Sequence, residues 1–518
     1  MRATPSPLFF RLPETSENLS RLTNNNDTFL FEPEPEKKET LRFYDTFDWK
    51  AWKTGNHVVL NGRKLIVYDL KSCREVCSAP LRRVPRSFFP DTVDHKETAA
   101  RLRAIAKLRA FIQFGSVETA VQRWRLLDDN KKTVATVELQ RLAGNHQNDS
   151  TICLTLFPVR GYDRFFEIAA AQIRQSCGKP AEITFRVYYS TLMEAAGAVP
   201  GDYSSKPSVK LDPRDTILDS SKSLLLSALD VLYANEEWIP KHIDTEFLHD
   251  YRVAVRRIRS ILAQFKGVFP PDTLAHYKNA FRELGKRTNN LRDQDVYLLQ
   301  EQHFMSILPE PMRDSLKPFF TDLFNRQKKE LRSFTGYIRS DAYKNLMREW
   351  EEFLRNDMTS DPATTPAAKT LTSDFAVATV SKAWKKAIRH GRSISSIATD
   401  TELHSLRIDC KKLRYLLEFY ASVFPARTLQ KVLKQLKTLQ NNLGVFVDLS
   451  VQQSYLFDYL STLKPDTHAI SFSAAIGGLI TALHHEREKT RQNFHNAFNT
   501  FDSDETETLF HALLKKHR

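Results

Sequence analysis

The chain has 518 residues, of which 41% are hydrophobic and 27% charged, so it has room for roughly two to four globular domains with packed cores. Lys and Arg outnumber Asp and Glu by 76 to 62, and the resulting net charge of +14 favours polyanionic partners. No run of about 18 apolar residues occurs, so we expect no membrane insertion. Five scattered cysteines are typical of a protein from a reducing, cytoplasmic environment.

The N-terminal part divides into a lead-in and a β-rich region. Residues 1–35 are rich in Pro, Asn, Ser and Thr, which predicts a flexible N-terminus. Residues 36–195 contain short runs in which apolar and polar residues alternate, as they do in half-buried strands. His57–Leu70 predicts a hairpin that turns at Asn61-Gly62. Asp129-Asn130-Lys131 predicts a second turn.

These patterns predict a β-rich domain over residues 36–195, with a mostly antiparallel, barrel-like sheet and inserted helices. The N-terminal half and the helical C-terminal half together make an α+β chain. Besides the hairpin, the expected strands are Lys107–Phe114, Val121–Leu127, Thr133–Leu142, Thr151–Pro158 and Glu182–Tyr189. One helix is expected at Tyr162–Ser176, with Gly178 as its C-cap.

Two sets of charged residues in this region could carry chemistry. Glu34 and Glu36 are two residues apart, and carboxylates at that spacing on a strand point the same way and can share a divalent cation. Pro33 and Pro35 interleave with them, which disfavours a paired strand. The second set could line a basic tunnel or could be ordinary surface charge on strand faces, and it comprises Arg63, Lys64, Arg109, Arg123 and Arg125.

The segments RFYDTFDWKAW at Arg42–Trp52 and FPVRGYDRFF at Phe157–Phe166 resemble the CYTH domain, the triphosphate tunnel fold. The resemblance implies an inorganic triphosphatase that holds Mg²⁺ or Mn²⁺ with Glu-x-Glu-x-Lys on its first strand. Glu34, Glu36 and Lys38 match these letters, but the prolines and the short spacing to Arg42 depart from the family pattern. We therefore expect a degenerate domain with no catalytic residues and no cofactor, and keep the triphosphatase as an alternative.

The C-terminal part of the sequence is predicted to be helical. Residues 196–214 form a linker by their Gly, Pro and Ser content. A first helical bundle is expected over residues 215–355, a second linker over 356–371 and a second bundle over 372–518. The expected helices include Glu246–Phe269, Asp272–Phe304 and Arg427–Asn442.

A long internal repeat organises these bundles. His249–Pro270 reads HDYRVAVRRIRSILAQFKGVFP and His404–Pro425 reads HSLRIDCKKLRYLLEFYASVFP, with an ungapped offset of 155 residues. Wound as helices, both copies have one cationic and one apolar side. The cationic side holds His249, Arg252, Arg256 and Arg259 in the first copy and His404, Arg407, Lys411 and Arg414 in the second; Arg257 and Lys412 are also equivalent.

Like charges at i,i+3 and i,i+4 destabilise an isolated helix, so their presence in both copies indicates an anionic partner. The alternative is that neighbouring Asp and Glu side chains neutralise them. Further cations that could extend a basic surface are Lys278, Arg282, Lys382, Lys385, Lys386, Arg389, Arg427, Lys431 and Lys434. The two histidines could donate a hydrogen bond to a phosphate oxygen or hold a helix start or facing carboxylate.

The repeated pattern H-x-x-R-x-x-x-[RK]-[RK]-x-R, with LRDQDV at Leu291–Val296, resembles the CHAD domain over residues 213–518. The resemblance implies two pseudo-symmetric helical bundles that bind inorganic polyphosphate on their basic faces, and it implies association with polyphosphate granules. In the second half Val447 and Ser450 replace the residues equivalent to Arg292 and Asp295. The basic helices lack interleaved aromatic residues, so nucleic acid is a disfavoured alternative partner.

Overall fold

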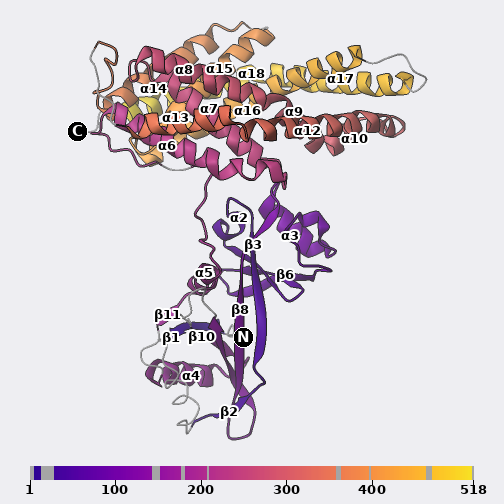
Figure 1. Ribbon diagram of the computed structural model, residues 1–518, viewed down its shortest axis with the longest axis vertical. Helices are drawn as coiled ribbons and strands as arrows, with labels where there is room; N and C mark the ends of the chain where they lie inside the picture. Colours follow the sequence, from indigo (N-terminus) through magenta and orange to yellow (C-terminus); the bar gives the residue numbers. More distant parts are fainter. Residues whose placement is uncertain are drawn as a thin grey trace. The chain divides into compact units, whose positions relative to one another are not determined.

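The structure, a computed structural model, describes residues 5–12, 28–142, 152–176, 181–206, 209–356, 363–395, 398–462 and 469–515. It divides into two compact units, Met1–Ser205 and Lys206–Arg518. The first unit is built on a curled β-sheet and the second is helical, as Figure 1 shows. The two-part α+β organisation predicted from the sequence is confirmed.

The first unit contains one antiparallel sheet that curls into a half-barrel. Its strand order is β11-β1-β10-β9-β8-β3-β4-β5-β6, and β2 and β7 pair with β8. The strands are β1 (Leu8–Leu12), β2 (Leu30–Pro33), β3 (Lys37–Asp45), β4 (Asn56–Asn61), β5 (Lys64–Asp69), β6 (Arg74–Pro80), β7 (Ser87–Phe88), β8 (Phe111–Leu127), β9 (Thr133–Leu142), β10 (Ile152–Pro158) and β11 (Ala181–Ile183). The helices are α2 (Lys50–Lys53), α3 (Lys96–Ala106), α4 (Asp163–Ser176) and α5 (Phe185–Ala195), with a 3₁₀ helix η1 (Pro90–Thr92).

Both predicted turns are confirmed. Asn61 pairs with Lys64 at the end of the β4–β5 hairpin, and Gly62 adopts a positive φ of 58° that glycine accepts without steric cost. Lys131, in the turn between β8 and β9, also has a positive φ, of 59°. The predicted helix before Gly178 is α4, whereas Gly178 itself lies outside the described residues.

The prediction that residues 1–35 are flexible is wrong for the two strands that they contribute, β1 and β2. β1 pairs with β10 on one side and β11 on the other. Phe10 and Leu12 enter one apolar cluster, while Phe9 enters a different one. A strand buried on both faces shows no alternation of apolar and polar residues, so the periodicity test could not detect it.

The predicted strands at Lys107–Phe114 and Glu182–Tyr189 are largely wrong. Lys107 is the C-cap of α3, with φ of 57°, and β8 begins only at Phe111. β11 ends at Ile183, and the following residues form α5, whose N-cap Thr184 accepts a hydrogen bond from the backbone N–H of Val187. β-branched and aromatic residues favour strands locally, but the burial of one helical face decides the structure here.

The second unit is helical throughout its described length, apart from short connections. Its first half contains α6 (Ile217–Glu236), η2 (Ile239–Lys241), α7 (Glu246–Gln264), α8 (Pro271–Arg287), α9 (Asn289–Leu299), α10 (Glu301–Ile307), α11 (Glu310–Arg313), η3 (Asp314–Leu316), α12 (Lys317–Ile338) and α13 (Asp341–Arg355). Its second half contains α14 (Thr372–Arg392), α15 (Asp400–Phe419), α16 (Ala426–Ser461), α17 (Ala469–Gln492), α18 (Phe494–Phe501) and α19 (Asp504–Leu514).

The two halves repeat one another with the offset seen in the sequence. The first residues of α6 and α14 are 217 and 372, and those of α8 and α16 are 271 and 426, so both pairs differ by 155. The predicted single helix Asp272–Phe304 is instead three helices, interrupted at Thr288 and Gln300. Its counterpart α16 runs unbroken to Ser461, well past the predicted end at Asn442.

The halves form one compact unit because they share contacts and a core. Thr216 bridges to Leu371, and the backbone N–H of Ile217 donates to the carbonyl of Thr370 at 2.8 Å. One apolar cluster combines side chains of α9, α10 and α12 with side chains of α16 and α17. Figure 1 shows α10, α12 and α17 extending together from one end of the unit.

Gly391 in α14 allows a close crossing with α18, because a Cβ at this position would overlap the buried ring of Phe498. We expect Gly391→Ala to destabilise the protein by about 1–3 kcal/mol through overpacking. The matched control is Gly444→Ala in α16, where a Cβ meets no atom within 4 Å, and this change should stabilise by about 0.5–1 kcal/mol. Chemical denaturation of both variants tests the pair, and an equal response would contradict the crossing geometry.

Candidate anion-binding groove

The two repeated helices, α7 and α15, bury their apolar sides and turn their cationic sides outward, as predicted. The buried residues are Val255, Ile258, Ile261, Leu262, Phe265 and Phe269 in the first copy, and Leu406, Cys410, Leu413, Leu416, Leu417 and Tyr420 in the second. Burial of these side chains fixes the rotation of each helix about its axis. The charged residues on the opposite sides are therefore held at the surface of the helical unit.

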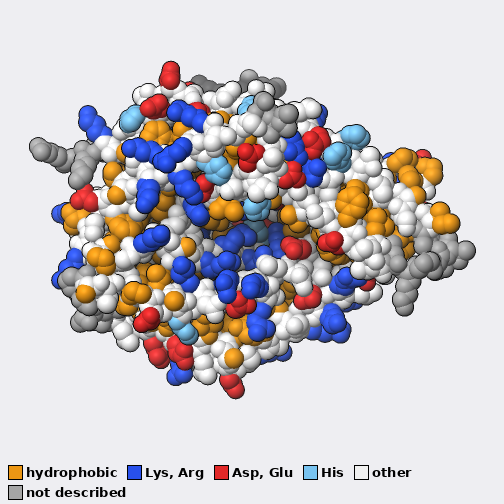
Figure 2. Space-filling model, turned by 90° about the horizontal axis from the view of Figure 1, so that it is seen from above, with side chains coloured by type: hydrophobic (Ala, Val, Ile, Leu, Met, Phe, Trp, Pro, Cys, Tyr) orange, Lys and Arg blue, Asp and Glu red, His pale blue; other side chains and the backbone are white. Residues whose placement is uncertain are grey.

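The cationic sides of the two copies meet at one groove with a volume of about 360 Å³. It is lined by α7, α8 and α15 through Arg256, Arg259, Ser260, Ala263, Gln264, Lys278, Arg282, Ile408, Lys411, Lys412 and Tyr415. Figure 2 shows Lys and Arg side chains gathered around a hollow on one face of the helical unit. The duplication thus brings side chains that are about 150 residues apart in the chain to one surface.

Four cations in the groove form no salt bridge among the described residues, although Asp448 acts electrostatically on the last of them: Arg256, Arg259, Lys278 and Lys411. The other two cations are paired, since Arg282 contacts Glu283 at 3.3 Å and Lys412 lies 4.0 Å from Asp409. The alternative that nearby carboxylates neutralise the basic faces therefore does not describe the centre of the groove. Its four cations are available to an anion.

Mutual repulsion within the groove is visible in the pKa of Lys411. Partial burial of the amine, followed by the charges of Arg407 and Arg256, lowers this pKa to about 8, although Asp448 acts in the opposite direction. Arg256 belongs to the first copy and Lys411 to the second, so the two halves influence each other electrostatically. An anion bound between them would relieve this repulsion.

Several motif residues are used within the fold. Arg252 donates to the Asn289 side chain at 3.0 Å and to Thr288 at the junction of α8 and α9, and partial burial lowers its pKa to about 10. Its counterpart Arg407 pairs with Asp448 at 3.1 Å. Arg414 pairs with Glu418 at 2.7 Å. These three side chains position helices around the groove and do not line it.

The remaining predicted cations lie outside the groove. Lys386 donates to the buried carboxylate of Asp409 at 2.8 Å, which His390 also contacts at 2.9 Å. Lys385 and Arg389 line a separate hollow of about 460 Å³ between α14 and α19. Arg257 lines a third hollow. The remaining candidates line none of these three hollows: Lys382, Arg427, Lys431, Lys434 and the residues His249 and His404 near the helix starts.

Sequence reasoning missed the uncharged residues that shape the groove. Gly285 of α8 lies beneath the Arg259 guanidinium, and a Cβ there would come within 3.0 Å of an Arg259 nitrogen. Ile408 is 42% exposed and, with Tyr415, provides apolar wall between the cations. An exposed isoleucine on the cationic side of a helix is the signal that could have identified this wall.

The acidic segment of the first half has an internal role. Asp295 is buried and accepts a hydrogen bond from Gln327 at 2.6 Å. Arg292 donates to the carbonyl of Thr245, just before α7, at 3.3 Å. In the second half the equivalent Val447 is buried as part of the core. At this position, the polar contact that Arg292 makes in the first half is therefore replaced by apolar packing of Val447 in the second half.

Most of the charged candidates of the N-terminal unit form ion pairs with oppositely charged residues of the same unit. Arg123 pairs with Glu138 at 2.5 Å, Arg125 with Glu32 at 2.7 Å, Lys64 with Glu75 at 2.9 Å, the buried Arg109 with Asp48 at 3.5 Å, and Glu36 with Arg141 at 3.4 Å. Arg63 is exposed in the β4–β5 turn. The pairings of Arg123, Arg125 and Lys64 match the interpretation of surface charge, whereas Arg109 is a buried residue of the fold.

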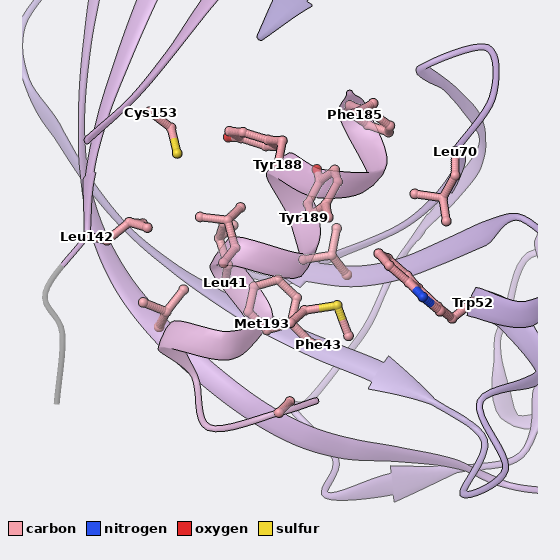
Figure 3. Packing of buried hydrophobic residues seen from close by; sticks show 14 of the residues in the cluster. Leu41, Phe43, Trp52, Leu70, Leu142, Cys153, Phe185, Tyr188, Tyr189 and Met193 are labelled. Atoms are coloured by element: carbon pink, nitrogen blue, oxygen red, sulfur yellow. The ribbon is translucent and has the colours of Figure 1, made fainter. Parts of the chain in front are cut away.

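The concave side of the half-barrel is filled with apolar side chains. Figure 3 shows Tyr188, Tyr189 and Met193 of α5 packed with Leu41 and Phe43 of β3. Glu34 and Glu36 lie between β2 and β3, while β1, the first strand, reads LFFRL and carries no carboxylate. In the described part of the chain, no group of three or more His, Cys, Asp and Glu side chains could hold a metal ion.

We therefore expect no turnover of tripolyphosphate by the purified protein with Mg²⁺ or Mn²⁺, because α5 packs apolar side chains against the concave side of the sheet. The measurement is phosphate release over time, with Glu34→Gln and Glu36→Gln as companion variants. Robust release that either variant abolishes would contradict the expectation and restore the triphosphatase alternative.

Comparison with known proteins agrees with the helical architecture. A family model for the CHAD domain matches residues 223–457, which include α7, α8 and α15. The helical unit therefore contains a CHAD domain. No curated protein matches the chain significantly. No helix in the described ranges has the length and apolar character required to span a membrane.

Two solved structures align with the chain. The crystal structure of the CHAD domain from the plant Ricinus communis aligns with a TM-score of 0.46 and 21% identity, covering 60% of this chain and 96% of that one. PptA from Streptomyces chartreusis aligns with a TM-score of 0.42 and 14% identity, covering 55% of this chain and 99% of that one.

Proposed function

We propose that the helical unit binds inorganic polyphosphate in the groove between α7, α8 and α15. The observation that carries the proposal is the set of four cations, from both copies of the repeat, that form no salt bridge among the described residues. Polyphosphate is a flexible line of closely spaced negative charges. Arg256 and Arg259 can each grip phosphate oxygens through two N–H groups, and Lys278 and Lys411 add point charges.

The groove is open at the surface and has contributions from three helices, which suits a chain that enters and leaves it. Two paired cations, Lys412 in the groove and Lys386 outside it, could exchange their contact with Asp409 for a phosphate. Affinity would come largely from released counterions, as it does for other polyanions. Binding of this kind would carry the protein to polyphosphate granules, which co-sedimentation with isolated granules would test.

Selectivity against nucleic acid follows from the composition of the groove. Tyr415 is the single aromatic residue among its lining side chains, and binding of single-stranded nucleic acid relies on successive aromatic platforms. We expect long-chain polyphosphate to displace a labelled polyphosphate probe at roughly tenfold lower phosphate concentration than DNA or RNA at physiological salt. Fluorescence anisotropy competition measures this ratio. Equal or better competition by nucleic acid would contradict the proposal that polyphosphate is the preferred ligand.

A further inference from the structure

Lys411 is an unpaired lysine of the groove on the second copy of the repeat. Its side chain reaches the surface and lines the groove together with Ile408, Tyr415 and the cations of the first copy, and it has no ion pair among the described residues. Lys412, its neighbour, is held near Asp409. Lys411 is therefore an accessible amine beside an anion-binding surface.

The charges around this amine also favour its neutral form. Arg407 on the same helix and Arg256 on α7 reinforce the effect of partial burial, and only Asp448 on α16 opposes them. With a pKa of about 8, roughly a quarter of the amine is unprotonated at pH 7.5, against about one part in a thousand at the usual value of 10.5. A desolvated lysine beside other cations is a common form of activated nucleophile.

We propose that Lys411 is acylated without an enzyme by small acyl phosphates, of which acetyl phosphate is the simplest. The phosphate group binds to Arg256, Arg259 and Lys278, and the neutral amine attacks the carbonyl carbon. An amide N–C bond forms, the C–O bond to phosphate breaks, and inorganic phosphate leaves with the bonding electron pair. The proton released by the amine goes to water, and nothing is oxidised or reduced.

Acylation would remove one of the four unpaired charges from the groove, so it would regulate whatever anion binds there. The inference needs only an anion-binding groove and an accessible amine. It does not require long-chain polyphosphate to be the ligand of the protein, and the two ideas can fail separately.

The test treats the full-length protein with acetyl phosphate at pH 7.5 and follows each lysine by quantitative peptide mass spectrometry. We expect Lys411 to react at least about tenfold faster than the exposed Lys431 and Lys437 of α16, because of its larger neutral fraction. A parallel reaction uses 4-nitrophenyl acetate, an uncharged donor. Equal rates at Lys411 and at the two reference lysines with acetyl phosphate would overturn the proposal.

Arg259→Gln separates capture of the phosphate group from the basicity of the amine, because Arg259 is not among the charges that lower the pKa of Lys411. The ratio of the acetyl phosphate rate to the 4-nitrophenyl acetate rate at Lys411 should fall several-fold in this variant, and an unchanged ratio would overturn the capture step and the proposal with it. Excess polyphosphate should protect Lys411. Fast acylation without that protection would support the inference while counting against polyphosphate binding.

Discussion

The triple variant Arg256→Gln, Arg259→Gln and Lys411→Gln should bind long-chain polyphosphate about a hundredfold or more weakly than the unchanged protein at physiological salt. These three side chains come from both copies of the repeat and form no salt bridge among the described residues. Their charge-assisted hydrogen bonds would be lost together. The slope of log affinity against log salt should also become shallower by about two units, if each cation neutralises one phosphate.

Stability should hold or improve slightly in the same variant, because it removes repulsion between like charges on α7 and α15. The measurement is a polyphosphate titration at several salt concentrations, with thermal melts alongside. The matched control removes the same charge elsewhere on the helical unit, through Lys329→Gln, Lys344→Gln and Arg348→Gln on the exposed surfaces of α12 and α13. If the control loses as much affinity as the groove variant, binding depends on net charge and the groove is not the site.

The sequence predicted the helical half well because its repeat and its periodicity report directly on burial. The 155-residue offset appears in the first residues of α6 and α14, and the apolar sides of α7 and α15 are buried as expected. The break at Thr288 was not predicted, since Asn289 and its neighbours are compatible with a continuous helix and the equivalent stretch of α16 is one. Tertiary contacts, including those made by Arg252, distinguish the two copies there.

The candidate site was predicted only in part, because helical periodicity identifies the side of a helix and not the partner of each residue. Arg252 and Arg256 share one side of α7, yet Arg252 is bonded to the α8–α9 junction while Arg256 lines the groove. In the same way, Arg407 and Lys411 share one side of α15, yet Arg407 pairs with Asp448 while Lys411 lines the groove. Which cations stay unpaired depends on carboxylates from α16 and other elements distant in sequence.

In the N-terminal unit, local alternation predicted the hairpins but not the element that fills the half-barrel. Phe185, Tyr188, Tyr189 and Leu192 recur at helical spacing, and Thr184 precedes them as an N-cap. The strand-favouring composition of the same stretch masked both signals. The alternation and turn signals therefore predicted the curled antiparallel sheet, while the interior of that sheet is an apolar core.

Polyphosphate affinity should fall as the pH rises from 7 to 9, by a factor that approaches ten, and Lys411 should cause the fall. In the free protein the pKa of Lys411 is lowered to about 8 by partial burial and by Arg407 and Arg256. A bound anion favours the protonated amine and raises this pKa, so binding takes up a proton above pH 8. Affinity is therefore greatest below the pKa of the free protein and is lost as the pH rises through it.

The other titratable groups around this amine are Arg259, Lys278 and Arg282 on α7 and α8, Lys412 and Tyr415 on α15, which line the same groove, and Asp448 on α16. Lys411→Arg isolates the contribution of Lys411, because guanidinium keeps its charge throughout this pH range. The variant should bind polyphosphate with nearly constant affinity between pH 7 and pH 9. Any titration of the polyphosphate ends affects both proteins equally, so it is removed when their affinities are compared. The same fall in both proteins would show that Lys411 does not contact the bound anion.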